Sequence, residues 1–163
     1  MRSVLVLSIA ILLLLQAPAP AQQKGSIVLT SVSEVEVVKQ NAEGKKEVKR
    51  VDAAKAAVVP GDTVIFTVSY ANTDTRPADR VVVINPVPRH VTYLDRSAEG
   101  KGTTIEFSVD GGKTYASPGK LTVTTAGKQR PAIAADYTHI RWVLVKPLAP
   151  GGQGSVSFRA TLK

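Results

Sequence analysis

Few side chains in this 163-residue chain are of the kinds that catalyse reactions or hold metal ions. There is no cysteine, and His90 and His139 lie far apart, with no Asp or Glu within two residues of either. Histidine ligands usually occur in short motifs and are oriented by a carboxylate. The chain also lacks a Gly-x-Ser-x-Gly elbow, a His-Glu-x-x-His pair and a phosphate-binding glycine loop. We therefore predict no catalytic residue, no metal site and no cofactor, although a carboxylate pair formed by folding would leave no sequence motif.

The segment from Ser108 to Tyr115 carries the most specific polar pattern. Its sequence, Ser-Val-Asp-Gly-Gly-Lys-Thr-Tyr, resembles the Asp-box hairpin of sialidases, Ser-x-Asp-x-Gly-x-Thr-Trp, with Tyr115 in place of tryptophan. A carboxylate at Asp110 can accept N–H groups of its own turn, and glycine permits positive φ. The resemblance implies a structural turn built from Ser108, Asp110, Gly112, Thr114 and Tyr115. A Ca²⁺ site would need more oxygen ligands than Asp110 offers.

Four basic residues gather near a turn, namely Lys45, Lys46, Lys49 and Arg50. One interpretation is contact with an anionic envelope polymer, a membrane surface or nucleic acid. The other is a solvated strand edge, where lysines prevent edge-to-edge pairing. We favour the second interpretation. Nucleic acid is not an expected partner, because no aromatic side chains are interleaved with the charges.

Aromatic residues are few, and the single tryptophan is the largest of them. Trp142 on a strand surface would suit carbohydrate binding, but it shares its phase with Ile140 and Leu144. Residues two apart on a strand point to the same face. We therefore predict a core tryptophan, as is common in β-sandwiches. Three tyrosines are better candidates than Trp142 for exposed contacts: Tyr93, Tyr115 and Tyr137.

The N-terminus has the organisation of a secretory signal peptide. A basic start precedes an apolar run over residues 4–15 and a small-residue segment that ends at Ala21. The run is short for a bilayer-spanning anchor, which is the alternative. We predict a signal peptide over residues 1–21 and cleavage after Ala21. Loss of Arg2 then leaves 20 basic and 13 acidic residues, a formal net charge of +7. Export without cysteine suits a bacterial periplasm or cell exterior.

The rest of the chain alternates apolar and polar residues between turn signals at Gly, Pro, Asn and Asp. This pattern predicts an all-β fold, an immunoglobulin-like antiparallel β-sandwich of about seven to nine strands. Its inward-facing positions come from several strands: Val64, Phe66, Val68, Tyr70, Ile105, Phe107, Val109, Ile140, Trp142, Leu144, Val156, Phe158, Ala160 and Leu162. Leu121 and Val123 belong to one more strand.

Some segments allow finer predictions. Residues 26–39 and 45–53 read as a first strand and a returning hairpin arm. Residues 53–57 fit either that arm or a helical turn. Residues 79–84 are apolar on both faces, which predicts a central strand that the prolines of residues 85–88 must break. Residues 125–136 read as a long polar loop and the most mobile part of the chain.

Residues 56–163 resemble the bacterial conserved-repeat domain, the family known as domain of unknown function eleven. The resemblance rests on three segments, residues 59–73, residues 78–93 and residues 148–158. It implies an immunoglobulin-like domain of exported or surface-attached proteins, with no assigned reaction. The chain departs from the family in having one copy, Asn85 where Asp is expected, and a preceding extension. We therefore divide the chain into the signal peptide, an extension over residues 22–55 packed on the sandwich, and the domain at residues 56–163.

These observations predict an exported, non-enzymatic module of the bacterial cell envelope with a structural or adhesion-like binding role. Its partner would be an envelope protein or a glycan, reached through sheet edges or loops. A periplasmic accessory or chaperone-like subunit of an assembly or secretion system is the alternative. A hydrolase with an unrecognised site is a third possibility, and it would require a deep pocket lined by ionisable groups. No membrane span is expected after cleavage of the signal peptide.

Overall fold

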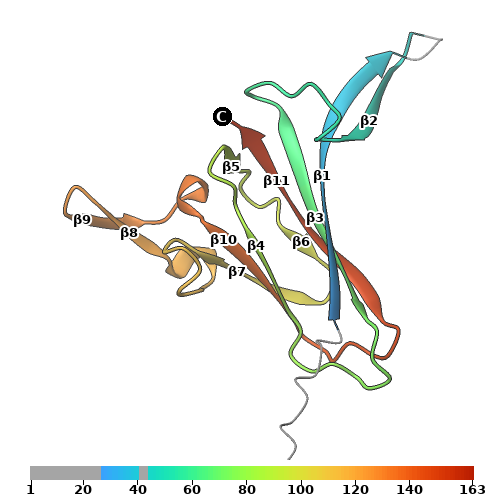
Figure 1. The fold of residues 1–163 in the computed structure, drawn as a ribbon. Helices are drawn as coiled ribbons and strands as arrows, with labels where there is room; N and C mark the ends of the chain where they lie inside the picture. The colour runs from blue at the N-terminus through green and yellow to red at the C-terminus, as the bar shows by residue number, and fades with distance from the viewer. Residues whose placement is uncertain (1–26, 41–43) are drawn as a thin grey trace, which may run out of the picture.

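The computed structural model describes residues 27–40 and 44–163, so the predicted signal peptide lies outside the described residues. The described part is built from eleven strands and two short 3-10 helices, which confirms the all-β class (Figure 1). They are β1 (Ile27–Gln40), β2 (Lys46–Asp52), β3 (Thr63–Asn72), β4 (Val82–Pro86), β5 (Val91–Tyr93), β6 (Glu99–Gly100), β7 (Thr103–Ser108), η1 (Pro118–Lys120), β8 (Thr122–Thr125), β9 (Lys128–Pro131), η2 (Ala134–Asp136), β10 (His139–Leu144) and β11 (Gln153–Leu162).

Two antiparallel sheets pack against each other. The larger has the order β2-β1-β3-β11-β5, with β6 also paired to β11, and the smaller has the order β4-β10-β7. The architecture is that of an immunoglobulin-like sandwich, but β11 pairs with β3 rather than with the preceding strand β10. The larger sheet has more strands than the smaller one. As a result, the smaller sheet does not cover β1 and β2.

The core lies between the sheets, where both contribute fully buried side chains. Trp142 and Ile140 from β10 meet Phe158 and Val156 from β11, and Val83 comes from β4. The predicted phase is confirmed for β10 and β11 and for Val64, Val68 and Tyr70 of β3. Other predicted core positions are only half-buried and pack on the core from outside, namely Phe66, Ile105, Val109, Leu144 and Leu162.

The prediction of a central strand over residues 79–84 is wrong, because β4 is an edge strand. Val82 and Ile84 point outward and are 43% and 47% exposed. The N–H of Val87 donates to Thr138 (2.9 Å) and Val81 accepts from Leu144 (3.0 Å), so the odd-numbered residues face β10. The nitrogen of Pro86 then faces the open side of the sheet. A proline can therefore end this strand without removing a hydrogen bond.

The predicted loop over residues 125–136 is instead mostly the β8–β9 hairpin and η2. Ala126 and Gly127 both have positive φ, at 50° and 76°, as a tight two-residue turn requires. Arg130 then holds Asp136 with two hydrogen bonds of 2.7 and 2.8 Å. The sequence pattern predicted a strand at Leu121 and Val123, which corresponds to β8, but it missed β9, which has only four residues.

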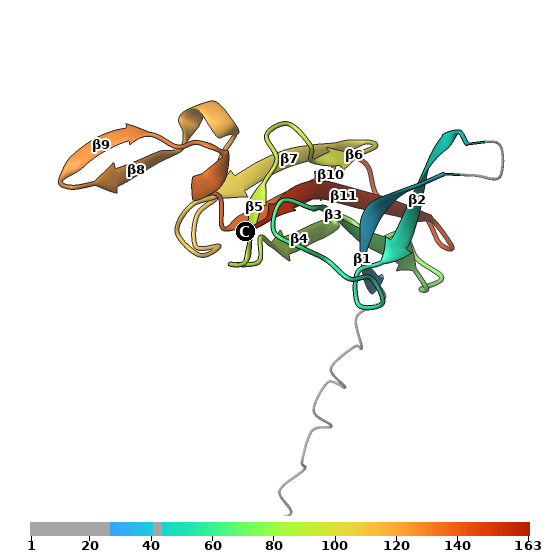
Figure 2. The same cartoon turned by 90° about the horizontal axis from the view of Figure 1, so that it is seen from above.

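Residues 53–56 form a turn without helix, in which the Asp52 carboxylate accepts the N–H of Ala54 (2.9 Å). The turn ends the β1–β2 arm, which projects at the opposite end of the molecule from the β8–β9 hairpin (Figure 2). Across residues 27–40 and 44–163, no helix is long and apolar enough to cross a membrane.

Candidate functional site

The Ser108–Tyr115 turn has the geometry that its sequence predicts. The Asp110 carboxylate accepts the N–H groups of Lys113 and Thr114, both at 3.0 Å, and the Thr114 hydroxyl at 2.6 Å. Buried Ser108 donates its hydroxyl to Asp110 (2.7 Å) and accepts the N–H of Gly112 (2.9 Å). The Thr114 hydroxyl and N–H, followed by the Ser108 hydroxyl, lower the pKa of Asp110 far below its usual range. The carboxylate is thus engaged within its own turn.

Tyr115 completes this turn by packing on the neighbouring strand. The guanidinium carbon of Arg141 lies 4.2 Å from the centre of the Tyr115 ring, within the range of a cation–π contact. Arg141 also donates two hydrogen bonds to Glu106, at 2.9 and 2.6 Å. Glu106, like Asp110, is therefore occupied by a structural contact.

The basic cluster lies on the β1–β2 arm, residues 34–52, where acidic residues balance the basic ones. Residues 34–52 contain five basic and five acidic residues, so the arm is formally neutral. Lys49 pairs with Glu47 (3.3 Å), and Glu36 lies between Arg50 (3.5 Å) and Arg159 (3.2 Å). Lys45 is exposed, and the side chain of Lys46 lies outside the described part. The arrangement fits a solvated arm better than an anion-binding surface.

The histidines do not come together into a metal site. His139 lies on β10, where its Nδ1 is 3.2 Å from the hydroxyl of Thr138, and His90 precedes β5. Within residues 27–40 and 44–163, no three His, Cys, Asp or Glu side chains are grouped as metal ligands.

Trp142 is buried, as its phase predicts, and is unavailable to a glycan. Its indole nitrogen is the buried side-chain polar atom that has no hydrogen-bond partner in the described part of the chain. Tyr93 and Tyr137 are also buried rather than exposed, whereas Tyr115 is half-buried.

These two tyrosines and Phe107 form the floor of an aromatic groove of about 790 Å³. Their ring centres lie 4.4 to 5.8 Å apart. Exposed Ile133 and the ion pair of Asp95 with Arg96 (3.6 Å) line its rim. Burial raises the pKa of both tyrosines, so their phenols remain neutral at pH 7. The volume and apolar floor are suited to an apolar ligand.

A second surface is the outer edge of β1, a feature that the sequence did not reveal. The N-terminal half of β1 pairs with β3 alone, because β2 begins to pair only at Glu34. The Ser33 carbonyl accepts the N–H of Ala53 (2.9 Å), so odd-numbered residues face away from β3. Ile27, Leu29 and Ser31 therefore present backbone N–H and C=O groups on a side where no described strand lies. We call these three residues the β1 edge.

The side chains around the β1 edge are apolar and exposed. Val28, Leu29 and Val32 are 49%, 51% and 50% exposed, and residues 27–33 carry no charge. Natural edge strands usually carry a lysine, a proline or a bulge that prevents pairing. The β1 edge has none of these protections.

The β1 edge opens onto a groove of about 470 Å³, which we call the edge groove. Ile27 and Leu29 form one wall, and the loop of residues 78–82 that leads into β4 forms the other. The groove exists because no strand of the smaller sheet covers β1.

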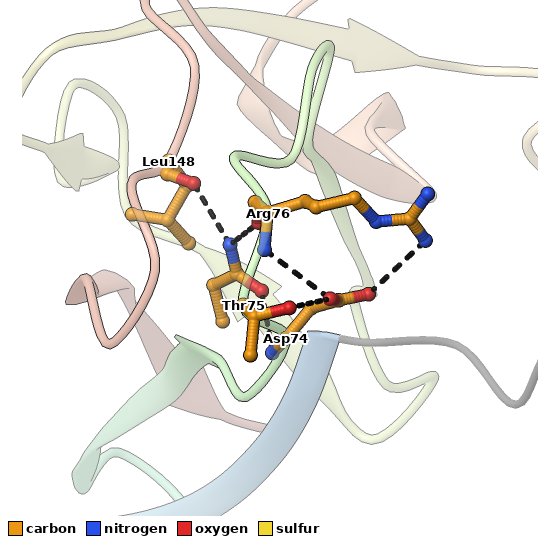
Figure 3. Close-up of polar contacts among 5 residues, drawn as sticks. Asp74, Thr75, Arg76 and Leu148 are labelled. Atoms are coloured by element: carbon orange, nitrogen blue, oxygen red, sulfur yellow. Dashed lines mark hydrogen bonds and ion pairs between the residues drawn. The ribbon is translucent and has the colours of Figure 1, made fainter.

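Buried Asn72 holds the residues that precede this loop and the Leu148 carbonyl, which also accepts the N–H of Ala78 (2.9 Å). Its side-chain nitrogen donates to the carbonyls of Arg76 (2.8 Å) and Leu148 (2.9 Å), and its side-chain oxygen accepts the N–H of Asp74 (3.0 Å). Asp74 in turn accepts hydrogen bonds from Thr75 and from the N–H of Arg76 (Figure 3). The N–H of Arg76 is the largest cause of the lowered pKa of Asp74.

The sequence gives no sign of the role of Asn72, and residues 26–39 read as an ordinary strand. The absence of any charged residue from residues 27–33 is a signal that was present in the sequence. Which side of that strand lacks a neighbour depends on where β2 begins to pair, and only the structure shows it.

No protein-family model matches this chain, and searches of curated proteins and of solved structures found no match. The resemblance of residues 56–163 to the conserved-repeat domain therefore remains a prediction from the residues themselves.

Proposed function

We propose that this protein is an exported, non-enzymatic binding module of the bacterial cell envelope with an adhesion-like role. The observation that carries the proposal is the β1 edge, an uncharged strand edge with exposed apolar side chains, whose outward backbone groups pair with no described strand. Such an edge binds an extended segment by adding it to the sheet, where backbone hydrogen bonds give affinity. The carboxylates of Glu106 and Asp110 are held in structural contacts, which supports a binding role over acid–base chemistry by these two groups.

A periplasmic accessory or chaperone-like subunit is the second candidate, and the edge groove is the observation that favours it. A client strand seated there would lie between the open edges of two sheets, and it would leave when the client completes its own fold. An accessory subunit would therefore release its partner during assembly, whereas an adhesion-like module would keep it.

Photo-crosslinking in intact cells tests the proposal. A photoreactive amino acid replaces Leu29 at the β1 edge, and in a matched control it replaces Val48, which is 59% exposed on the β1–β2 arm. We expect a discrete adduct from position 29 and none from position 48. Equal, diffuse labelling at both positions would contradict binding at this edge.

The mass of the exported chain tests the predicted signal peptide, since cleavage after Ala21 leaves Gln22 as the first residue.

A further inference from the structure

We propose that the strand taken up at the β1 edge is β1 of a second copy of this chain, antiparallel and related by a twofold axis at Leu29. The inference rests on the proposed function, because it uses the same edge and names the partner. A twofold interface requires a surface that is complementary to itself. Three properties of the β1 edge meet that requirement.

The first property is the hydrogen-bond register. With Leu29 opposite Leu29 of the second copy, Ile27 lies opposite Ser31 and Ser31 opposite Ile27. All three residues whose backbone groups face outward are then paired with one another, as antiparallel hydrogen-bonded pairs.

The second property is charge. The molecule is basic, so copies repel each other at most surfaces, but residues 27–33 bring no charge to the interface. Like charges directly opposite each other destabilise a strand pair. The β1 edge is therefore a place where two copies can approach without that penalty.

The third property is the pair of opposite charges beside Leu29. Asp79 and Arg80 line the edge groove together with Leu29, and both are exposed. Neither makes an ion pair or side-chain hydrogen bond within the described part of the chain, and Arg80 is held at a positive φ of 51°. A twofold axis at Leu29 brings this loop near its own copy in reverse order. Asp79 of each chain then faces Arg80 of the other.

Sedimentation of the full chain, expressed with its own N-terminus, provides the test across protein concentrations from micromolar to near-millimolar. We expect a reversible monomer–dimer equilibrium. Leu29→Lys places two ammonium groups opposite each other at the axis and should weaken the dimer by about tenfold or more. Val48→Lys makes the same change on the arm and should leave the equilibrium unaltered. Circular dichroism of both variants checks that each is folded.

A cysteine pair tests the register, because the chain has no native cysteine. Leu29→Cys places two thiols across the axis with Cα atoms about 5.5 Å apart, which suits a disulfide. The matched variant Val32→Cys, equally exposed, would lie about 20 Å from its copy. Mild oxidation should join two copies of the first variant by a disulfide and leave copies of the second variant without one.

The charge pair is tested by exchange of its members. Arg80→Asp alone should weaken the dimer, and adding Asp79→Arg to that variant should restore it.

A chain that remains monomeric at every concentration, or that links as readily through position 32 as through position 29, overturns the second copy as partner. If the chain is monomeric and the crosslink from Leu29 in cells contains a different protein, the inference fails and the proposed function survives. No adduct in cells and no dimer in solution would remove both.

Discussion

Asp110 and Asn72 fix the course of the chain at places where no regular structure does so. Each makes several hydrogen bonds to backbone groups within a few residues, and Asn72 also reaches the distant β10–β11 connection. The Asp110 turn was predictable because its pattern is local in sequence. The role of Asn72 was not, because its partner Leu148 is 76 residues away.

The carboxylate of Asp110 should make stability depend on pH in the acid range. Because folding lowers its pKa below the ordinary 3.8, its contribution is present above that value and is lost as the pH falls further. Asp110→Asn should therefore lower the free energy of unfolding at pH 7 and flatten its decline on acidification. Urea unfolding at a series of pH values measures this. Glu99→Gln, at an exposed carboxylate that makes no ion pair or side-chain hydrogen bond with the described residues, is the control and should reproduce the parent curve.

Loss of the Asn72 amide should loosen the wall of the edge groove. Asn72→Ala leaves the carbonyls of Arg76 and Leu148 without their donor, which should cost about 2–3 kcal/mol of unfolding free energy. Thr75→Ala in the same loop removes only an exposed contact and should change stability by less than about 0.5 kcal/mol. Equal losses in the two variants would show that Asn72 does not hold the loop.

Strand elements were predictable where one face of the strand is buried. Alternation gave the correct phase for β10, β11 and most of β3, because each has the core on one side; Ile65, on the opposite face of β3, is buried as well. It failed for β4, whose apolar residues lie on both faces although the strand is at an edge. It also missed β6 and β9, which are short and held by a turn or a neighbour rather than by a hydrophobic face.

The two sheets pack so closely that β6 tolerates only glycine at position 100. A Cβ atom there would lie 2.8 Å from Trp142 and 3.0 Å from Val156. Gly100→Ala should therefore destabilise the sandwich by about 1–3 kcal/mol through overpacking. Gly119→Ala meets open space and should change stability by less than about 0.5 kcal/mol. Thermal unfolding of the two variants compares them directly, and a neutral Gly100→Ala would contradict the packing.

Phe158 and Phe66 stack with ring centres 4.9 Å apart, Phe158 at the centre of the core and Phe66 at its margin. Replacing fully buried Phe158 by alanine should lower the free energy of unfolding by about 3–5 kcal/mol. Half-buried Phe66 should cost less, about 1–3 kcal/mol, because part of its ring already contacts water. A loss below about 1 kcal/mol at Phe66 would contradict its inward phase. Denaturant unfolding of both variants measures the difference.

The whole molecule is a sandwich whose two sheets differ in width. Because the smaller sheet has three strands, it leaves β1 uncovered on the side where β4 also has a free edge. Sequence alone predicted the sandwich and its core strands. It could not predict the mismatch in width, which arises because β11 pairs with β3. Nor could it predict that β2 pairs with β1 only from Glu34 onward.

Amide hydrogen exchange along β1 tests most directly whether this uncovered edge is where a strand is added. In dilute solution the amides of Leu29 and Ser31 should exchange fast, while those of Val28, Thr30 and Val32, which face β3, exchange slowly. In concentrated solution, or with the cell-envelope fraction, Leu29 and Ser31 should become as slow as their neighbours. If their exchange is already slow in dilute protein, or stays fast under both other conditions, the β1 edge is not a binding edge.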